Sequence, residues 1–275
     1  MSTTAFYRAV FIRKKGQLMQ SLFKYRARRF SRGVASKLAL LSSRFHALLP
    51  TASTISRREH HWEKSKNNRL MVFLPGIDDV AEDFERRGFI ADTRHHGFAQ
   101  GAIAVDAHYG YYASRRIFSA ITDDVVGKAR SHGYHQIWMV GVSLGGFGAA
   151  TYAANRPGEI AGLLLLAPYL GGAELISEIT AAGGVKHWNP GHVEEGNYPR
   201  RLWAWIKHEY AVVGRPRIPL YLGYGKGDRF VAAHRLLAEV IPSSHVFSIP
   251  GGHNWKTWTK IWRHFLSRRE SVFAK

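Results

Sequence analysis

The stretch "QIWMVGVSLGGFGAATYAANRP", residues 136–157, carries the strongest local fold signal in this chain. Its first part is apolar after Gln136, which is typical of a β-strand buried on both faces. The part after Ser143 is rich in glycine and alanine and is typical of a helix that ends at Pro157. Ser143 therefore lies at a predicted strand-to-helix turn.

Two glycines surround that turn in the pattern Gly141-x-Ser143-x-Gly145. The pattern by itself is weak, because 27 glycines and 19 serines in 275 residues give about 0.2 such matches by chance. A serine held in a strained turn above a sheet, however, brings the positions two before and two after it too close for side chains. Gly141 and Gly145 meet that demand, which favours Ser143 as a nucleophile.

Short apolar runs alternate with longer amphipathic segments on both sides of this turn. Such alternation predicts an α/β fold with a mostly parallel twisted sheet flanked by helices. We expect strands at 70–74, 102–106, 136–142, 161–167, 219–225 and 245–249, and helices at 78–87, 115–131, 144–155, 229–240 and 255–267.

One interval is too long for an ordinary crossover between strands. The segment at about 168–216 follows a central predicted strand, and we interpret it as a small inserted helical lid. Its tryptophans are Trp188, Trp203 and Trp205. They either line an apolar pocket under the lid or pack the lid onto the body of the domain.

The net charge of +19 is concentrated near the N-terminus, since residues 1–69 hold 16 Lys and Arg against two Glu. We expect a basic N-terminal arm over 1–67, partly helical or disordered, followed by one domain over 68–275. An anionic membrane surface or an acidic partner fits this arm best. A merely solvated arm and an organelle transit peptide are alternatives, and nucleic acid is the less favoured partner.

The chain has no run of about 18 apolar residues that would cross a bilayer. Its best candidate for a secretory signal, "VASKLALLSSRFHALLP" at 34–50, is interrupted by Lys37 and Arg44, so we expect no cleaved signal peptide. These features predict a cytoplasmic protein that is peripheral at a membrane or targeted to an organelle if the arm directs it there.

Two later segments follow predicted strands with an acid and then a histidine. "PLYLGYGKGDRF" (219–230) has Asp228 after one strand, and "HVFSIPGGHNWKTW" (245–258) has His253 after the last. With its serine turn, the chain resembles the α/β-hydrolase superfamily over roughly 68–267. In that family the catalytic order is serine, acid, histidine, so the resemblance implies Ser143 as nucleophile, Asp228 as acid and His253 as base.

The histidine loop carries a narrower likeness. "GGHNWKTW" (251–258) is similar to the corresponding loop of an esterase branch that contains S-formylglutathione hydrolases, feruloyl esterases and mycolyltransferases. The resemblance also implies two backbone N–H donors for an oxyanion hole, from Leu144 and from Ile77 in "FLPGIDD" (73–79). The family usually has a His-Gly pair in the latter loop, where this chain has Pro75-Gly76.

Other titratable residues compete for these roles. Asp106 also ends a predicted strand, but the earlier position is usually structural in the family, and we favour Asp228. The remaining candidates are expected to be structural, capping or solvated: His60, His61, His95, His96, His234, His245, Asp78, Asp79, Asp123 and Asp124. No metal-binding motif is present, and no cofactor is predicted.

The chain has no cysteine, so covalent chemistry would use another nucleophile. The sequence predicts a serine hydrolase that cleaves a carboxylic ester or thioester through an acyl-enzyme. The substrate would be a small-molecule or acyl-chain ester. An acyltransferase with the same three residues is an alternative, as is a non-catalytic protein of the same fold that docks through its basic arm.

Overall fold

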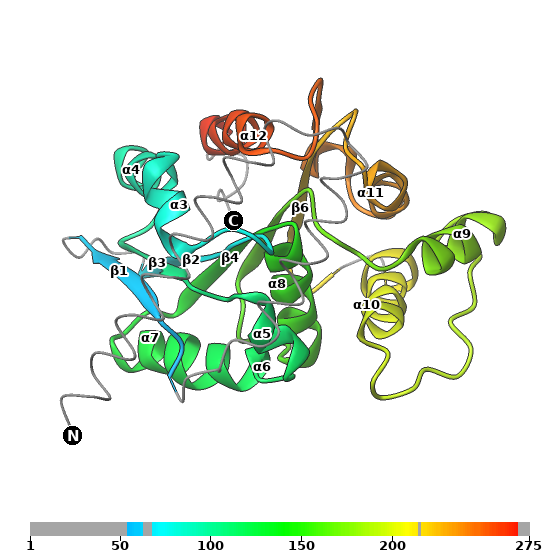
Figure 1. The fold of residues 1–275 in the computed structure, drawn as a ribbon, viewed down its shortest axis with the longest axis horizontal. Coiled ribbons are helices and arrows are strands. Elements are labelled where there is room, and N and C mark those ends of the chain that lie inside the picture. The colour runs from blue at the N-terminus through cyan, green and yellow to red at the C-terminus, as the bar shows by residue number, and fades with distance from the viewer. Residues whose placement is uncertain (1–53, 63–67, 214–215, 269–275) are drawn as a thin grey trace, which may run out of the picture. The chain divides into compact units, whose positions relative to one another are not determined.

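The computed structural model of the protein describes residues 54–62, 68–213 and 216–268, so most of the predicted basic arm lies outside it. The described residues form a seven-stranded sheet between layers of helices (Figure 1). The order of the strands is β1-β3-β2-β4-β5-β6-β7, and all neighbouring pairs are parallel except β1 with β3. The strands are β1 (Arg57–His61), β2 (Arg69–Leu74), β3 (Gly101–Val105), β4 (Gln136–Val142), β5 (Gly162–Leu166), β6 (Leu220–Gly225) and β7 (Val246–Ile249).

All six predicted strands are present, and each differs from its expected range by at most one residue at either end. Strands β2 to β6 are buried almost along their whole length, because helices cover both faces of the sheet. This burial explains why their sequences are continuously apolar. The fold class predicted from the sequence is therefore confirmed.

The edge strand β1 was not predicted. Its sequence, RREHH, is polar and partly exposed, which suits an antiparallel edge and gives no apolar signal. Just before it, Ile55 is only 1% exposed, and its N–H donates a hydrogen bond of 3.0 Å to Asp124 Oδ2. The folded domain thus begins before residue 68, and the arm boundary expected at residue 67 needs this correction.

Two separate helical layers cover the sheet (Figure 1). One face packs against α3, α4 and α12 through residues such as Phe73, Phe89 and Trp262, and the other packs against the remaining helices. Among the described residues, no helix combines the length and apolar character needed to cross a membrane. The helices outside the insertion are α3 (Ala81–Arg86), α4 (Phe89–His95), α5 (Tyr109–Ala113), α6 (Ile117–Ala120), α7 (Gly127–Ser131), α8 (Leu144–Asn155), α11 (Val231–Ala238) and α12 (Trp255–Ser267).

Helices α8 and α12 match their predicted ranges, and α3 and α11 lie within the ranges predicted at 78–87 and 229–240. Helix α3 ends near Gly88, whose φ of 84° is readily adopted by glycine, and α4 follows as a separate helix. The helix predicted at 115–131 consists of α6, a π-helical segment, Ile121–Val126, and α7. Neither α4 nor α5 was predicted, since both are short and packed by distant parts of the chain.

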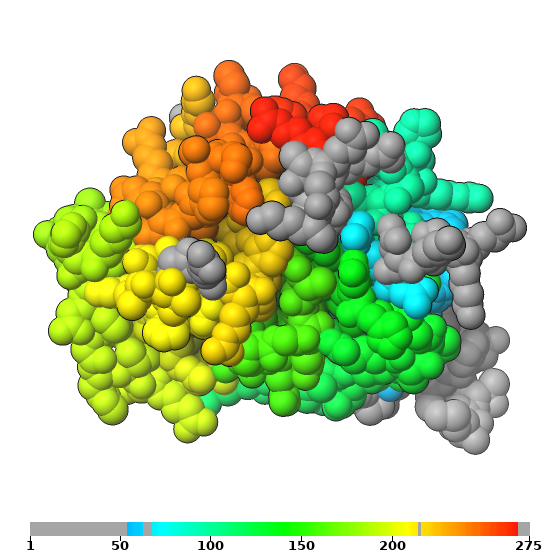
Figure 2. Space-filling model, turned by 180° about the vertical axis from the view of Figure 1, so that it is seen from behind, coloured from blue at the N-terminus to red at the C-terminus, as the bar shows by residue number. Residues whose placement is uncertain are grey.

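The predicted insertion lies between β5 and β6 and is helical. It contains α9 (Ala173–Ala181), α10 (Tyr198–Ile206) and a π-helical segment, Lys207–Val212. Seen from behind, its yellow-green and yellow surface adjoins the orange surface of α11 (Figure 2). Trp188 and Trp203 are at most 1% exposed and belong to the core, so they pack the insertion onto the body. Its action as a lid remains a prediction.

Candidate active site

Ser143 occupies the turn between β4 and α8 with an unusual backbone conformation, φ 53° and ψ −113°. Its N–H donates to the carbonyl of Leu166 at 2.9 Å, and its carbonyl accepts from the N–H of Tyr169 at 3.0 Å. The end of the neighbouring strand β5 thus holds the turn from both sides. The serine is 5% exposed.

The two flanking glycines are required by close backbone contacts. A Cβ on Gly141 would lie 2.4 Å from the carbonyl oxygen of Gly145, and a Cβ on Gly145 would lie 2.1 Å from the carbonyl oxygen of Leu74. Both distances are far below any contact that a side chain can make. Gly145 therefore lets the start of α8 rest directly on the end of β2.

Asp228 and His253 come from loops that follow β6 and β7, and these loops are joined by their backbones. Lys226 N–H donates to Ile249 O and Gly227 N–H donates to Gly251 O, both at 2.8 Å. The carboxyl ends of parallel strands meet at one edge of a sheet, so the two loops open toward Ser143. This pairing brings the acid and the histidine together although they are 25 residues apart in sequence.

The three side chains form a continuous hydrogen-bonded chain. His253 Nδ1 lies 2.8 Å from Asp228 Oδ2, and His253 Nε2 lies 2.9 Å from Ser143 Oγ. A carboxylate can only accept, so Nδ1 carries the ring proton and Nε2 is left to accept the proton of the serine hydroxyl. The structure brings together all three residues that the sequence singled out.

The Asp228 carboxyl is 3% exposed and remains ionised. Its burial acts to raise its pKa, but the hydrogen bond and charge of His253 and the N–H of Phe230, 2.8 Å from Asp228 Oδ1, outweigh the burial and lower the pKa below its usual range. The His253 ring is flanked edge-to-face by Phe230 and Trp258, with centroids 5.2 and 5.0 Å away. These two rings, which sequence reasoning missed, fix the orientation of the imidazole.

The loop after β2 lies beside the serine. A Cβ on Gly76 would lie 3.6 Å from Ser143 Cβ and 2.7 Å from Asp79 Oδ2, so this loop turns tightly against the nucleophile. The next residue is Ile77, one of the two expected oxyanion donors. The other is Leu144, the first residue of α8, where helix N–H groups are not paired within the helix. Trp255 Nε1–H donates to Asp79 Oδ1 at 2.9 Å and ties this loop to α12.

Three of the competing titratable residues bind backbone groups. Asp106 Oδ1 accepts the N–H of Ala81 at 2.7 Å at the start of α3, and His245 Nδ1 donates to the carbonyl of Leu220 at 3.0 Å. Asp124 Oδ2 accepts the N–H of Ile55, and Asp124 Oδ1 lies 3.3 Å from Lys128 Nζ in an ion pair. Within the described parts of the chain, no three His, Asp or Glu side chains are grouped as metal ligands.

His234 on α11 is a buried residue whose importance the sequence did not indicate. Its side chain is fully buried, and Nε2 lies 2.9 Å from the carbonyl oxygen of Pro168. Burial lowers its pKa to about 4, so the ring is neutral at neutral pH. Pro168 lies between Ala167, which has a φ of 46°, and Tyr169, which contacts the serine backbone. His234 thus braces the segment that holds the serine turn.

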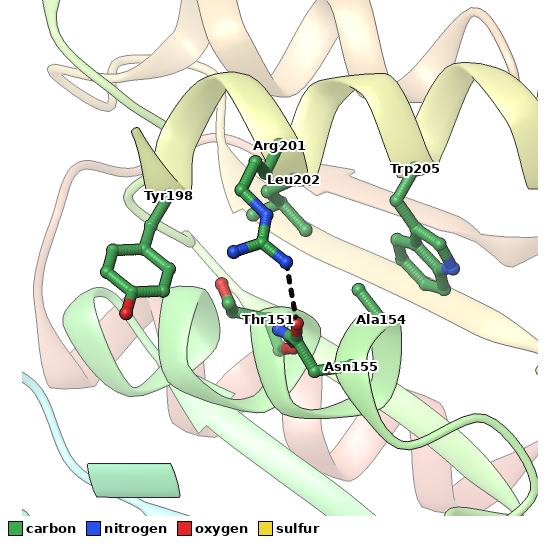
Figure 3. Close-up of a pocket in the computed structure, with 7 residues that line it drawn as sticks. All are labelled: Thr151, Ala154, Asn155, Tyr198, Arg201, Leu202 and Trp205. Atoms are coloured by element: carbon green, nitrogen blue, oxygen red, sulfur yellow. Dashed lines mark hydrogen bonds between the residues drawn. The ribbon is translucent and has the colours of Figure 1, made fainter. Parts of the chain in front are cut away.

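The predicted lid tryptophans do not lie against the three residues. Trp203 Nε1–H donates to the carbonyl of Leu170 at 2.7 Å, and Trp188 Nε1–H donates to Glu178 Oε1 at 2.8 Å. Trp205 borders a cavity of about 110 Å³ between α8 and α10, shown in Figure 3, in which Arg201 donates to Asn155 at 3.2 Å. None of Ser143, Asp228 and His253 lines this cavity.

Comparisons with known proteins identify the fold. A family model described as the α/β-hydrolase fold matches residues 72–194. A monoacylglycerol lipase from Paleococcus ferrophilus has a similar structure, with a TM-score of 0.50 and 14% identity over 78% of this chain and 99% of the lipase. An S-formylglutathione hydrolase from Staphylococcus aureus has a TM-score of 0.50 and 13% identity over 81% of this chain and 99% of the hydrolase. No curated protein matches the sequence.

Likeness at such low identity shows the fold and nothing finer. The chain has the α/β-hydrolase fold, and the resemblance seen in its sequence is confirmed at that level. Membership of the narrower esterase branch remains a prediction.

Proposed function

We propose that this protein of the α/β-hydrolase fold is a serine hydrolase that cleaves a carboxylic ester or thioester of a small-molecule or acyl-chain substrate. One observation carries the proposal, namely the hydrogen-bonded chain from Asp228 through His253 to Ser143 with distances of 2.8 and 2.9 Å. A non-catalytic protein of this fold has no physical reason to bury an ionised carboxylate that is hydrogen-bonded to a histidine, which in turn is hydrogen-bonded to a strained serine.

In the first half of the reaction, Ser143 Oγ attacks the carbonyl carbon of the substrate while His253 Nε2 takes the hydroxyl proton. The resulting imidazolium is stabilised by the ionised Asp228 on its other nitrogen. When the tetrahedral intermediate collapses, His253 gives the proton to the departing alcohol or thiol. The acyl group is then joined to Ser143 as an ester.

Negative charge develops on the carbonyl oxygen in each tetrahedral intermediate. The N–H groups of Leu144 and Ile77 are the proposed donors, because both come from segments that meet at Ser143. The positive end of the α8 dipole adds to their effect. Loss of one such donor typically lowers turnover by about 10²- to 10³-fold.

In the second half, a water molecule replaces the departed alcohol or thiol. His253 Nε2 removes a proton from the water, the hydroxide attacks the acyl carbon, and the proton returns to Ser143 Oγ as the acid product leaves. Both steps use the same donors and the same base. The enzyme therefore returns to its starting protonation state.

Aromatic rings beside the triad supply apolar surface for the substrate. Phe230, which flanks His253, lies 5.6 Å from Tyr169, and Tyr169 lies 6.0 Å from Phe147, each distance joining ring centroids. Phe147 and Phe230 are partly exposed. Their position on either side of Tyr169 favours an acyl group that is itself apolar.

Labelling with a fluorophosphonate tests this proposal. The wild-type protein should be labelled, and Ser143→Ala should abolish labelling and lower kcat for a reactive small ester by roughly 10⁴- to 10⁶-fold. Ser177→Ala is the matched control, because Ser177 is exposed on α9. Labelling that survives in the Ser143→Ala protein would refute the assignment, provided that circular dichroism shows both variants folded.

A further inference from the structure

A second concave surface lies outside the triad, along the outer side of α12. It is an open groove of about 410 Å³, large enough for a small organic ligand. We call it the basic groove, and its lining residues are Arg86, Arg87, Trp255, Lys256, Thr259, Lys260 and Arg263. Five of these seven side chains are cationic, and none is acidic.

Two of the five cations are neutralised by neighbouring carboxylates. Arg86 Nη2 lies 2.7 Å from Asp83 Oδ1, and Arg263 Nε lies 3.0 Å from Asp92 Oδ2. These pairs hold the two arginines in place at the rim. They do not remove the excess of positive charge, because three cations remain.

Arg87, Lys256 and Lys260 have no carboxylate partner within the part of the chain that the structure describes. The Arg87 guanidinium lies 5.7 Å from the ring centroid of Trp255, which orders it over an aromatic face. Lys256 and Lys260 are one helical turn apart, a spacing at which like charges repel and destabilise a helix.

The position of Lys256 is unfavourable for the helix itself. It is the second residue of α12, whose first turn contains no acidic residue, and a cation at that end opposes the helix dipole. Residues 70–275 carry a net charge of only +5, with 23 Lys and Arg against 18 Asp and Glu. A general need for solubility does not explain three unpaired cations in one groove. A bound anion would relieve both the mutual repulsion and the conflict with the dipole.

We propose that the basic groove binds a soluble ligand that carries a diphosphate or two neighbouring phosphate groups. A single carboxylate carries one negative charge, which is too little to compensate Arg87, Lys256 and Lys260. Two phosphate groups carry enough negative charge to compensate all three cations. Lys256 and Lys260 reach the anion from one helix while Arg87 reaches it from the end of α3. Trp255 adds a flat apolar wall at the end of the groove where the helix begins. The binding does not depend on the proposed hydrolase activity.

Calorimetric titration of the full-length protein with inorganic pyrophosphate at constant ionic strength tests the proposal. The wild-type protein should bind, and the double variant Lys256→Gln/Lys260→Gln should bind at least tenfold more weakly. Both lysines are exposed, and removing their charges favours α12, so the variant should fold. Lys186→Gln/Arg235→Gln is the control, because it removes two exposed charges elsewhere and leaves residues 1–69 unchanged.

The control protein should keep the wild-type affinity within twofold. Equal affinities in all three proteins would assign the binding to other basic residues and overturn the proposal. Absence of pyrophosphate binding by the wild-type protein would also overturn it. A third contrary outcome is a lysine-dependent affinity for phosphatidylglycerol vesicles without affinity for pyrophosphate, which would make the groove a membrane contact.

Discussion

The backbone of Ser143 is held in a left-handed conformation by contacts from a different strand. Such a conformation costs about 1–3 kcal/mol for a residue other than glycine and persists only when its surroundings enforce it. The enforcing segment here is Leu166–Tyr169, which is itself held by the hydrogen bond between Pro168 and His234. The geometry at one residue thus depends on a buried histidine two strands away.

The buried His234 makes stability depend on pH in a defined window. Its pKa falls from 6.5 to about 4 on folding. Between these two pH values the His234 side chain is therefore protonated in the unfolded chain but neutral in the folded protein. Stability should therefore be lost as the pH falls from 6.5 toward 4, by as much as about 3 kcal/mol from this residue. His234→Gln keeps a donor for Pro168 but cannot titrate, so its stability should fall less over the same window.

Urea unfolding at pH 7 and pH 4.5 measures this difference. Other titrating groups contribute equally to both proteins and cancel in the comparison. His192→Gln is the control, because His192 is exposed, and this variant should follow the wild-type protein. A wild-type protein that loses no more stability than His234→Gln would contradict the prediction.

At the scale of elements, the site depends on how closely α8 approaches β2. Gly145 allows that approach, since a Cβ there would meet the carbonyl oxygen of Leu74 at 2.1 Å. The loop that carries Ile77 follows Leu74 directly. The packing of one helix on one strand therefore also sets the distance between the proposed oxyanion donors and Ser143.

Gly145→Ala should push α8 away from β2. We expect it to lower the free energy of unfolding by about 2 kcal/mol or more and to lower kcat through displacement of the loop after β2. Gly172→Ala is the control, because a Cβ on Gly172 meets nothing within 4 Å and its φ is −72°. Its cost should stay below about 1 kcal/mol. Equal stability and turnover in the Gly145→Ala and Gly172→Ala proteins would contradict this account.

At the scale of the whole molecule, the boundary between arm and domain decides which truncations are tolerated. A chain that starts at Pro50 keeps every residue that the structure describes. A chain that starts at Glu59 loses the buried Ile55, its hydrogen bond to Asp124 and part of β1. We expect the shorter chain to melt roughly 5 to 10 °C lower in a thermal scan. Matching melting temperatures would show that β1 contributes little.

The chain that starts at Pro50 also tests the predicted role of the basic arm. It should lose affinity for anionic vesicles in a salt-dependent way, because residues 1–49 carry most of the positive charge. Its hydrolysis of a small soluble ester should remain close to that of the full chain. Vesicle sedimentation at low and high salt measures the first effect. Equal sedimentation of both chains would contradict docking through the arm.

The positions of the buried strands along the chain and the three proposed catalytic residues could be predicted from the sequence. Continuous apolar runs reveal β2 to β6 because both faces of each strand are buried. The glycines around Ser143 indicate the turn because side chains there would meet backbone atoms, those of Gly145 for a Cβ on Gly141 and those of Leu74 for a Cβ on Gly145. The loop positions of Asp228 and His253 follow from the strands before them.

The remaining features depend on contacts between distant parts of the chain. The polar edge strand β1 is held by pairing with β3, and Trp188 and Trp203 of the insertion are core residues because distant parts of the chain pack against them. The brace from His234 to Pro168 spans 66 residues, and the charge of the basic groove is assembled from α3 and α12. By itself the sequence determined the buried strands, the turn at Ser143 and the loop positions of Asp228 and His253, because runs of apolar residues and glycines at fixed spacing mark them. Only the tertiary structure decided which side chains meet, because those contacts carry no local pattern.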